Sequence, residues 1–335
     1  MADRASLLDA FLVRAGVGGA ARMPIPGDAS FRRYVRLSRG AARWIAMDAP
    51  PPAEDVRPFV LVARHLRALG LSAPEVLAVD EAQGFLLLED LGDDTFTRVL
   101  ARGGDEGELY ALAIDALAAL QSHPDATRIA VPAHDARLLA DEGASLFVDW
   151  YVPEATRRPV PPAMREEYLG LWHEALAPAL APRPTLALRD FHIDNLLVLP
   201  GRPGAARCGL LDFQDAATGS PAYDLVSLLE DVRRDVSPAV AAAMRLRHRA
   251  ALPHLAGEEF DMACAVLAAA RHARVLGLWI RLWRRDGKPA YLAFLPRTWR
   301  LLEGALRHPA LARLRAWFDH HAPPGLRRLP TGAST

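Results

Sequence analysis

Two carboxylates and one amide occur at a spacing that suits phosphoryl transfer. Asn195 follows Asp190 by five residues, and Asp212 follows Asp190 by 22 residues at the end of a short apolar run. Moving a phosphoryl group from a magnesium nucleotide to a hydroxyl needs a carboxylate that orients or accepts the hydroxyl proton. It also needs hard oxygen ligands that hold the metal between the phosphates. The spacing therefore predicts Asp190 as the catalytic base and Asn195 with Asp212 as magnesium ligands.

Three polar residues near this set have structural interpretations that compete with chemical ones. His192 lies inside the loop, and we interpret it as a hydrogen-bonded loop histidine. Asp215 fits a second metal or substrate contact and a solvated turn equally well. Asp224 begins a helical pattern, which favours a role in capping the helix or bracing the loop.

The elements that must position these residues divide into a small mixed segment and a larger helical one. Up to residue 90, short strand patterns surround one amphipathic helix near 56–69, with Gly70 as its expected C′ residue. The strand-like runs 76–79 and 85–88 are predicted to form a hairpin. Beyond residue 92, helical periods prevail near residues 108–121, 136–150, 163–177, 222–231 and 259–283, with strand-like runs only between 185 and 212.

This layout predicts an α+β, protein-kinase-like bilobal fold. The expected parts are an N-terminal nucleotide-binding lobe at 1–90, a mainly helical catalytic and substrate lobe at 91–320, and a flexible tail at 321–335.

Composition and charge argue against several other classes of protein. The 335 residues include 40 basic and 40 acidic side chains, a balance that disfavours a nucleic-acid-binding protein. Cys208 and Cys264 lack the spacing of a zinc site or a disulfide framework. No apolar run approaches the ~20 residues of a membrane span, and the N-terminus does not resemble a signal peptide. We therefore expect a cytoplasmic protein without a membrane, nucleic-acid or obligate protein partner.

The motif Arg189-Asp190, together with Asn195 and Leu211-Asp212-Phe213, resembles the aminoglycoside phosphotransferase and choline kinase superfamily, relatives of the protein kinases. The segments 27–34, 47–51, 85–92 and 285–289 resemble one branch of it, the bacterial kinases that phosphorylate N-acetylmuramate and N-acetylglucosamine at C1. The resemblance covers residues 5–320. It implies ATP and Mg2+ as cofactors, a small-molecule amino sugar as substrate, and a role in peptidoglycan recycling.

Nucleotide contacts are expected in two segments. The loop 26–34 has one glycine in place of the glycine-rich pattern of protein kinases, but its backbone N–H groups and the Ser30 hydroxyl can still cover phosphates. An ordinary hairpin turn is the alternative. The segment from Glu89 to Leu91 joins the lobes, and its backbone offers adenine a donor and an acceptor. The predicted nucleotide-binding residues are Ser30, Phe31, Arg32, Arg33, Glu89 and Leu91.

The strand lysine that usually grips the nucleotide phosphates in this superfamily is missing. Met47 or Asp48 stands near that position, and the only lysine of the chain is Lys288. An arginine is the natural substitute because a guanidinium group binds phosphate in bidentate fashion. Arg32, Arg33 and Arg43 are the candidates. The missing lysine also motivates an alternative function, a catalytically inactive kinase-like protein that binds sugar or nucleotide.

Substrate contacts are expected from the helical lobe. The predicted residues are Arg137, Glu142, Trp150 and Arg189, with a position in the apolar core as the alternative for Trp150. Acidic and basic side chains are mixed here, which suits a neutral or anionic sugar better than a polycationic aminoglycoside. The carboxylate of N-acetylmuramate would need one of the arginines of this segment, Arg137, Arg157, Arg158 or Arg165. Arg271, Arg274 and Lys288 are interpreted as part of a solvated helix face. A kinase of an aminoglycoside or another small alcohol remains the alternative among enzymes.

Overall fold

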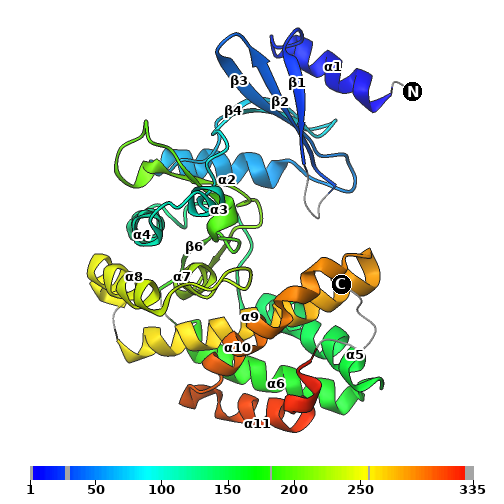
Figure 1. Cartoon of the computed structure of the whole chain (residues 1–335), viewed down its shortest axis with the longest axis vertical. Helices are drawn as coiled ribbons and strands as arrows, with labels where there is room; N and C mark the ends of the chain where they lie inside the picture. Colours follow the sequence, from blue (N-terminus) through cyan, green and yellow to red (C-terminus); the bar gives the residue numbers. More distant parts are fainter. Residues whose placement is uncertain (1–2, 27–30, 182, 256, 329–335) are drawn as a thin grey trace. The chain divides into compact units, whose positions relative to one another are not determined.

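The computed structural model describes residues 3–26, 31–181, 183–255 and 257–328, which divide into two compact units (Figure 1). Unit 1 comprises Met1–Asp125 and Ile193–Ala216, and unit 2 comprises Ala126–His192 and Ala217–Thr335. Asp190 therefore belongs to unit 2, whereas Asn195 and Asp212 belong to unit 1. The predicted lobes, which end at residues 90 and 320, divide the chain at other positions than these two units, and their boundaries stay predictions.

Unit 1 combines a five-stranded antiparallel sheet, a two-stranded hairpin and four α-helices in its described part. Its helices are α1 (Arg4–Arg14), α2 (Arg57–Ala68), α3 (Phe96–Ala101), α4 (Glu106–Ser122) and the 3-10 turns η3 (Ile193–Asn195) and η4 (Gly204–Arg207). Its strands are β1 (Ala21–Ile25), β2 (Arg33–Arg39), β3 (Ala42–Asp48), β4 (Val76–Asp80), β5 (Phe85–Glu89), β7 (Leu196–Val198) and β8 (Cys208–Leu210).

The five-stranded sheet has the order β1-β2-β3-β5-β4. Helix α1 buries Phe11 and Leu12 against the sheet residues Leu37, Ala46 and Phe85, which forms one apolar core. The predicted helix near 56–69 is α2, and Gly70 follows it with a φ of 80°, the left-handed conformation expected of a C′ glycine. The predicted hairpin is confirmed, because β4 pairs with β5 in antiparallel register.

Unit 2 is mainly helical. Its helices are α5 (Val152–Thr156), α6 (Pro162–Ala179), α7 (Ala222–Leu229), α8 (Pro238–Ala251), α9 (Glu258–Asp286), α10 (Leu295–Ala305) and α11 (Ala312–His321). Two π-helical segments are η1 (Arg137–Ala144) and η2 (Phe147–Tyr151). The 3-10 segments are η5 (Pro253–Leu255), η6 (Pro289–Phe294), η7 (Pro309–Leu311) and η8 (Pro324–Leu326). The strands β6 (Thr185–Ala187) and β9 (Ala217–Gly219) pair with each other in antiparallel register.

Helix α9 forms the core of unit 2. It packs against α6, α7, α10, η1 and η2. Within the described residues it is the one helix long and apolar enough to cross a membrane, but 83% of its most apolar window is buried inside the fold. This burial is typical of a core helix.

The helix predicted near 136–150 differs from expectation, because η1 and η2 are π-helical. Apolar spacing reports which face of a helix is buried and does not determine the offset of the backbone hydrogen bonds. Helix α9 packs closely against this segment at Gly277, where a Cβ atom would lie 2.0 Å from the carbonyl oxygen of Leu146. The glycine permits backbone to lie against backbone.

Candidate active site

The backbone of the loop that carries Asp190 is hydrogen-bonded to a buried carboxylate of the same unit, that of Asp224. Asp224, 1% exposed, accepts hydrogen bonds from the backbone N–H groups of Leu188 at 2.6 Å and Arg189 at 2.9 Å. The N–H of Asp190 donates to the carbonyl of Leu188 at 2.9 Å. The predicted bracing role of Asp224 is thus confirmed, and the backbone on both sides of the Asp190 amide is fixed.

Arg189 adopts a left-handed backbone conformation with a φ of 70°, which is costly for a residue with a side chain. Such conformations persist where the surroundings over-determine them. Burial raises the pKa of Asp224 to about 6, and the hydrogen bonds from Leu188 and Arg189 partly offset this effect. Asp224 is therefore largely ionised at neutral pH, in the form that accepts both bonds.

His192 follows Asp190 in the same loop and is buried, with 4% of its surface exposed. Its Nε2 atom lies 3.3 Å from Nη1 of Arg233. Burial, together with the charges of Arg233 and Arg271, holds the pKa of His192 well below its usual value. A neutral, enclosed imidazole agrees with a structural role in the loop.

The predicted metal ligands of unit 1 are brought side by side by the hairpin β7–β8. Leu196 pairs with Leu210, and the N–H of Leu211 donates to the carbonyl of Asn195 at 2.9 Å. The side-chain amide nitrogen of Asn195 lies 3.5 Å from Oδ2 of Asp212. Since a half-turn of an amide exchanges its nitrogen and oxygen, both side chains can present oxygen atoms to the same point.

Asp212 is anchored on both sides. Its φ of 56° is left-handed, and its Oδ1 atom accepts a hydrogen bond from Nε2 of Gln214 at 2.9 Å. The next residue, Phe213, is completely buried and its ring lies 5.0 Å from that of Phe59 in α2. The aromatic pair holds the backbone while the carboxylate stays accessible to solvent.

The donors of this pair fit a magnesium ion, which prefers carboxylate and carbonyl oxygens together with water and phosphate oxygens. The described residues contain no group of three or more His, Cys, Asp or Glu side chains that would form an all-protein metal site. Asn195 and Asp212 therefore suit a metal whose remaining ligands come from a nucleotide and water. This is the way in which proteins usually bind Mg2+.

Arg32 lies in the same electrostatic environment as Asp212. Its Nε atom donates to Oε2 of Glu54 at 2.9 Å, and both side chains are largely buried. Burial lowers the pKa of Arg32, but the charges of Tyr34, Glu54 and Asp212 more than offset this, so its pKa is raised. If Asp212 binds a metal as predicted, a guanidinium group held beside it is suitably placed to contact phosphate.

The other predicted nucleotide contacts are less well defined. Ser30 and Gly27 lie outside the described residues. Phe31 is 70% exposed and its N–H donates to Glu54, and Arg33 is exposed at the start of β2. The N–H of Glu89 donates to the carbonyl of Glu75 at 2.9 Å, so an adenine donor in this segment would have to come from Asp90 or Leu91.

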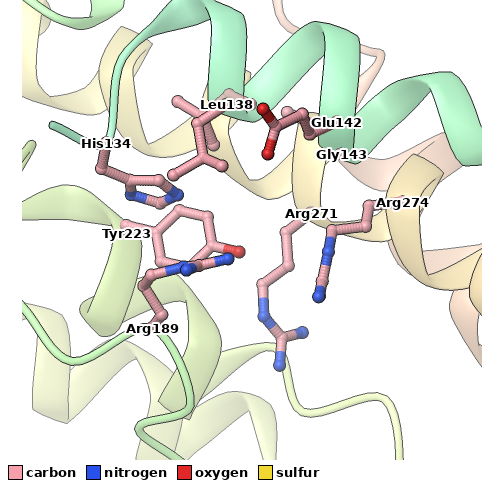
Figure 2. A pocket seen from close by; sticks show the side chains of 10 residues that line it. His134, Leu138, Glu142, Gly143, Arg189, Tyr223, Arg271 and Arg274 are labelled. Atoms are coloured by element: carbon pink, nitrogen blue, oxygen red, sulfur yellow. The ribbon is translucent and has the colours of Figure 1, made fainter. Parts of the chain in front are cut away.

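A pocket of about 90 Å³ lies within unit 2, beside the backbone of the Asp190 loop (Figure 2). It brings together two of the four predicted substrate residues, Glu142 and Arg189. The other two do not line it: Arg137 is exposed and forms an ion pair with Glu142, and Trp150 is half-buried elsewhere on η2. The full lining is His134, Leu138, Leu139, Glu142, Gly143, Arg189, Tyr223, Ala270, Arg271 and Arg274.

Sequence reasoning missed His134, Tyr223, Arg271 and Arg274. The interpretation of Arg271 as solvated is wrong, because only 5% of this residue is exposed. A signal was present in the sequence: Arg271 follows the buried Leu267 by four residues and therefore lies on the apolar stripe of α9. A charged residue on such a stripe is rarely placed there for stability.

Comparisons with known proteins show which family the chain resembles. The family model described as "Phosphotransferase enzyme family" matches residues 22–260. A protein from Caulobacter vibrioides named "N-acetylmuramate/N-acetylglucosamine kinase" is 39% identical over 97% of this chain and 99% of its own length.

Two solved structures share the fold at low sequence identity. A choline/ethanolamine kinase family protein from Mesorhizobium loti has a TM-score of 0.60 at 17% identity, covering 95% of this chain and 100% of that one. The ADP-bound aminoglycoside phosphotransferase APH(2'')-Ib has a TM-score of 0.59 at 15% identity, covering 90% of this chain and 98% of that one. These likenesses confirm the predicted protein-kinase-like fold class.

Proposed function

The chain belongs to the phosphotransferase enzyme family and is a sugar kinase, and we propose that it transfers a phosphoryl group from ATP to the C1 hydroxyl of N-acetylmuramate or N-acetylglucosamine. The observation that carries this proposal is the Asp190 loop, braced by Asp224 and continuing into the Asn195 and Asp212 pair. The name of the relative that matches nearly the whole chain supports the choice of sugar.

Asp190 is the general base in this proposal. As the C1 oxygen forms its bond to the γ-phosphorus, the hydroxyl proton passes to the carboxylate of Asp190. The bond between the γ-phosphorus and the bridging oxygen breaks, and ADP leaves with those electrons. A hemiacetal hydroxyl is more acidic than an ordinary alcohol, so its proton passes more readily to a carboxylate.

Asn195 and Asp212 would hold Mg2+ in this scheme, and Arg32 would contact the phosphates in place of the missing strand lysine. A bound Mg2+ neutralises charge on the β- and γ-phosphates. The backbone near Leu91 is proposed to receive adenine, and the loop near Ser30 to cover the phosphates. Arg189 and Glu142 are proposed to contact the sugar.

We place the enzyme in the cytoplasm, where ATP is available and where amino sugars recovered from peptidoglycan would be re-used. The burial of α9 supports this placement, as does the free state of both cysteines. No nucleic-acid, membrane or obligate protein partner is proposed.

A coupled assay of ADP release with Mg2+ tests the substrate across N-acetylmuramate, N-acetylglucosamine, choline and kanamycin. We expect turnover with the two amino sugars, and 31P NMR of the product should show an anomeric phosphate. Turnover with kanamycin alone would favour the aminoglycoside alternative. Sugar binding without ATP consumption would favour the inactive binding protein.

The variant Asp190→Asn tests the base, with an expected loss of kcat of ~10²- to 10⁴-fold. Asp105→Asn is the matched control, because Asp105 is an exposed carboxylate that caps α4 through Glu108. Equal activity of the two variants would refute the role of Asp190.

A further inference from the structure

We propose that the pocket lined by Arg189, Arg271 and Arg274 binds a carboxylate, and that this carboxylate is the lactyl group of N-acetylmuramate. The inference rests on the proposed function and adds to it the part of the protein that distinguishes the acidic sugar from the neutral one.

The buried guanidinium of Arg271 is the first argument. Arg271 is 5% exposed, and its Nη1 atom has no hydrogen-bond partner among the described residues. A buried charged donor without a partner is costly, and buried arginines are normally satisfied by an anion. Figure 2 shows Arg271 and Arg274 extending from α9 into the same space as Arg189. An anion bound there would supply the missing acceptor.

The balance of charge in the pocket is the second argument. Three guanidinium groups face one carboxylate, Glu142, which already forms an ion pair with Arg137. His134 is part of the lining, and burial, followed by the charges of Arg189 and Arg274, lowers its pKa to about 3. The imidazole therefore stays neutral, and the pocket keeps a surplus of positive charge near neutral pH.

Two acids outside the lining that interact with these arginines are already engaged. Asp224 interacts electrostatically with Arg189, but its carboxylate accepts the backbone N–H groups of Leu188 and Arg189. Glu230 influences Arg271 electrostatically, but its carboxylate lies 3.0 Å from Nε2 of His272 and 2.8 Å from Nη2 of Arg245. Glu230 does not line the pocket. Neither carboxylate is an acceptor for the Nη1 atom of Arg271, which has no hydrogen-bond partner among the described residues.

The volume of the pocket and its position next to Asp190 indicate which group of the substrate it would bind. A volume of about 90 Å³ holds a carboxylate with a few attached atoms and is too small for an entire sugar. The lining residue Arg189 directly precedes Asp190, so its side chain and the proposed base start one residue apart. A sugar whose C1 hydroxyl is at Asp190 can direct a substituent of the same ring to Arg189. The lactyl ether of N-acetylmuramate is such a substituent, and N-acetylglucosamine lacks it.

The pocket walls show how the chain keeps this space open. A Cβ atom at Gly219 would lie 2.6 Å from Cβ of His134, so the glycine lets the histidine backbone approach β9. The N–H of His134 donates to the carbonyl of Thr218 at 2.8 Å. The rings of His134 and Tyr223 form a T-shaped pair with their centroids 4.4 Å apart. These contacts fix the part of the wall that His134 and Tyr223 form.

The test compares kcat/KM for N-acetylmuramate, for its lactyl carboxamide and for N-acetylglucosamine in the variants Arg271→Gln and Arg274→Ala. Arg284→Ala is the control, because Arg284 lies on the same helix but pairs with Glu154 and does not line the pocket. We expect a loss of ~10- to 100-fold for N-acetylmuramate and less than about threefold for the two neutral sugars. For the wild type, kcat/KM should fall by the same factor when the lactyl carboxamide replaces N-acetylmuramate.

The outcomes separate this inference from the proposed function. If the wild type phosphorylates both natural sugars and the variants lose both equally, the carboxylate site is refuted and the kinase stands. If the wild type phosphorylates neither sugar, the proposed function itself fails. Should Arg271→Gln not fold, as judged by its thermal melt, the half-buried Arg274→Ala decides. Inhibition by inorganic phosphate that disappears in Arg274→Ala, without any change in sugar preference, would identify a free anion as the ligand and overturn the proposal.

Discussion

The carboxylate of Asp224 accepts the backbone N–H of Arg189 at 2.9 Å, and Arg189 has a left-handed φ of 70°. The two observations belong together, because a backbone conformation of this kind needs an external partner to hold it. The residue after Arg189 is the proposed base, Asp190. We therefore expect Asp224 to be a positioning residue that acts on catalysis through the loop.

Replacing Asp224 with Asn should lower kcat. An amide offers one oxygen to the two N–H groups of Leu188 and Arg189, so one buried donor loses its acceptor, at a cost of ~1–3 kcal/mol. We expect kcat to fall about tenfold to a hundredfold, with the KM for ATP changed less than about twofold. Steady-state kinetics beside the Asp105→Asn control would measure this. An unchanged kcat in Asp224→Asn would show that the loop holds its conformation without the carboxylate.

The free energy of unfolding should depend on pH because Asp224 titrates at a different pH in the folded and unfolded protein. Burial raises its pKa to about 6, so the folded protein keeps this proton at pH values where the unfolded chain has lost it. The stabilisation linked to that proton is full below pH ~4 and is lost as the pH rises through ~6, by ~3 kcal/mol in total. Urea denaturation should show the free-energy advantage of wild type over Asp224→Asn falling between pH ~4 and ~7. An advantage that grows with pH would contradict the raised pKa.

Arg32 should contact the nucleotide and not the sugar. Arg32→Ala removes a guanidinium group that is held by Glu54 beside Asp212, and we expect the KM for ATP to rise or kcat to fall by ~10- to 100-fold. Arg39→Ala is the control, because Arg39 is an exposed arginine at the far end of β2, the strand that Arg32 directly precedes. The KM for the sugar should stay within about twofold. Nucleotide kinetics that match the control would transfer the role of the missing lysine to another arginine.

Local patterns predicted much of the fold because they reflect local physics. The amphipathic period of 56–69 and its terminal Gly70 predict α2, since side-chain periodicity and glycine's access to positive φ are properties of the segment itself. The π-helical turns of η1 and η2 were not predictable in this way. They occur where α9 approaches at Gly277, and that contact joins segments far apart in the sequence.

The site shows the same division. The spacing of Asp190, Asn195 and Asp212 was visible because one loop and one hairpin carry all three. The arginines of the pocket were not grouped in advance, because Arg189 follows a strand whereas Arg271 and Arg274 come from a helix much later in the chain. Only tertiary packing brings them to one cavity. The position of Arg271 on an apolar stripe is the local trace of that packing.

The close approach of α9 to η2 yields a stability test with an internal control. Gly277→Ala would place a Cβ atom 2.0 Å from the carbonyl oxygen of Leu146 and 2.6 Å from the nitrogen of Phe147, so backbone must move. We expect a loss of ~1–3 kcal/mol or more in the free energy of unfolding. Gly170→Ala is the matched change in α6, at an exposed glycine whose Cβ position has nothing within 4 Å, and it should stabilise by ~0.5–1 kcal/mol. Chemical denaturation of both variants gives the signs, and stabilisation of equal size in the two would show that helix propensity, and not the contact with η2, governs both positions.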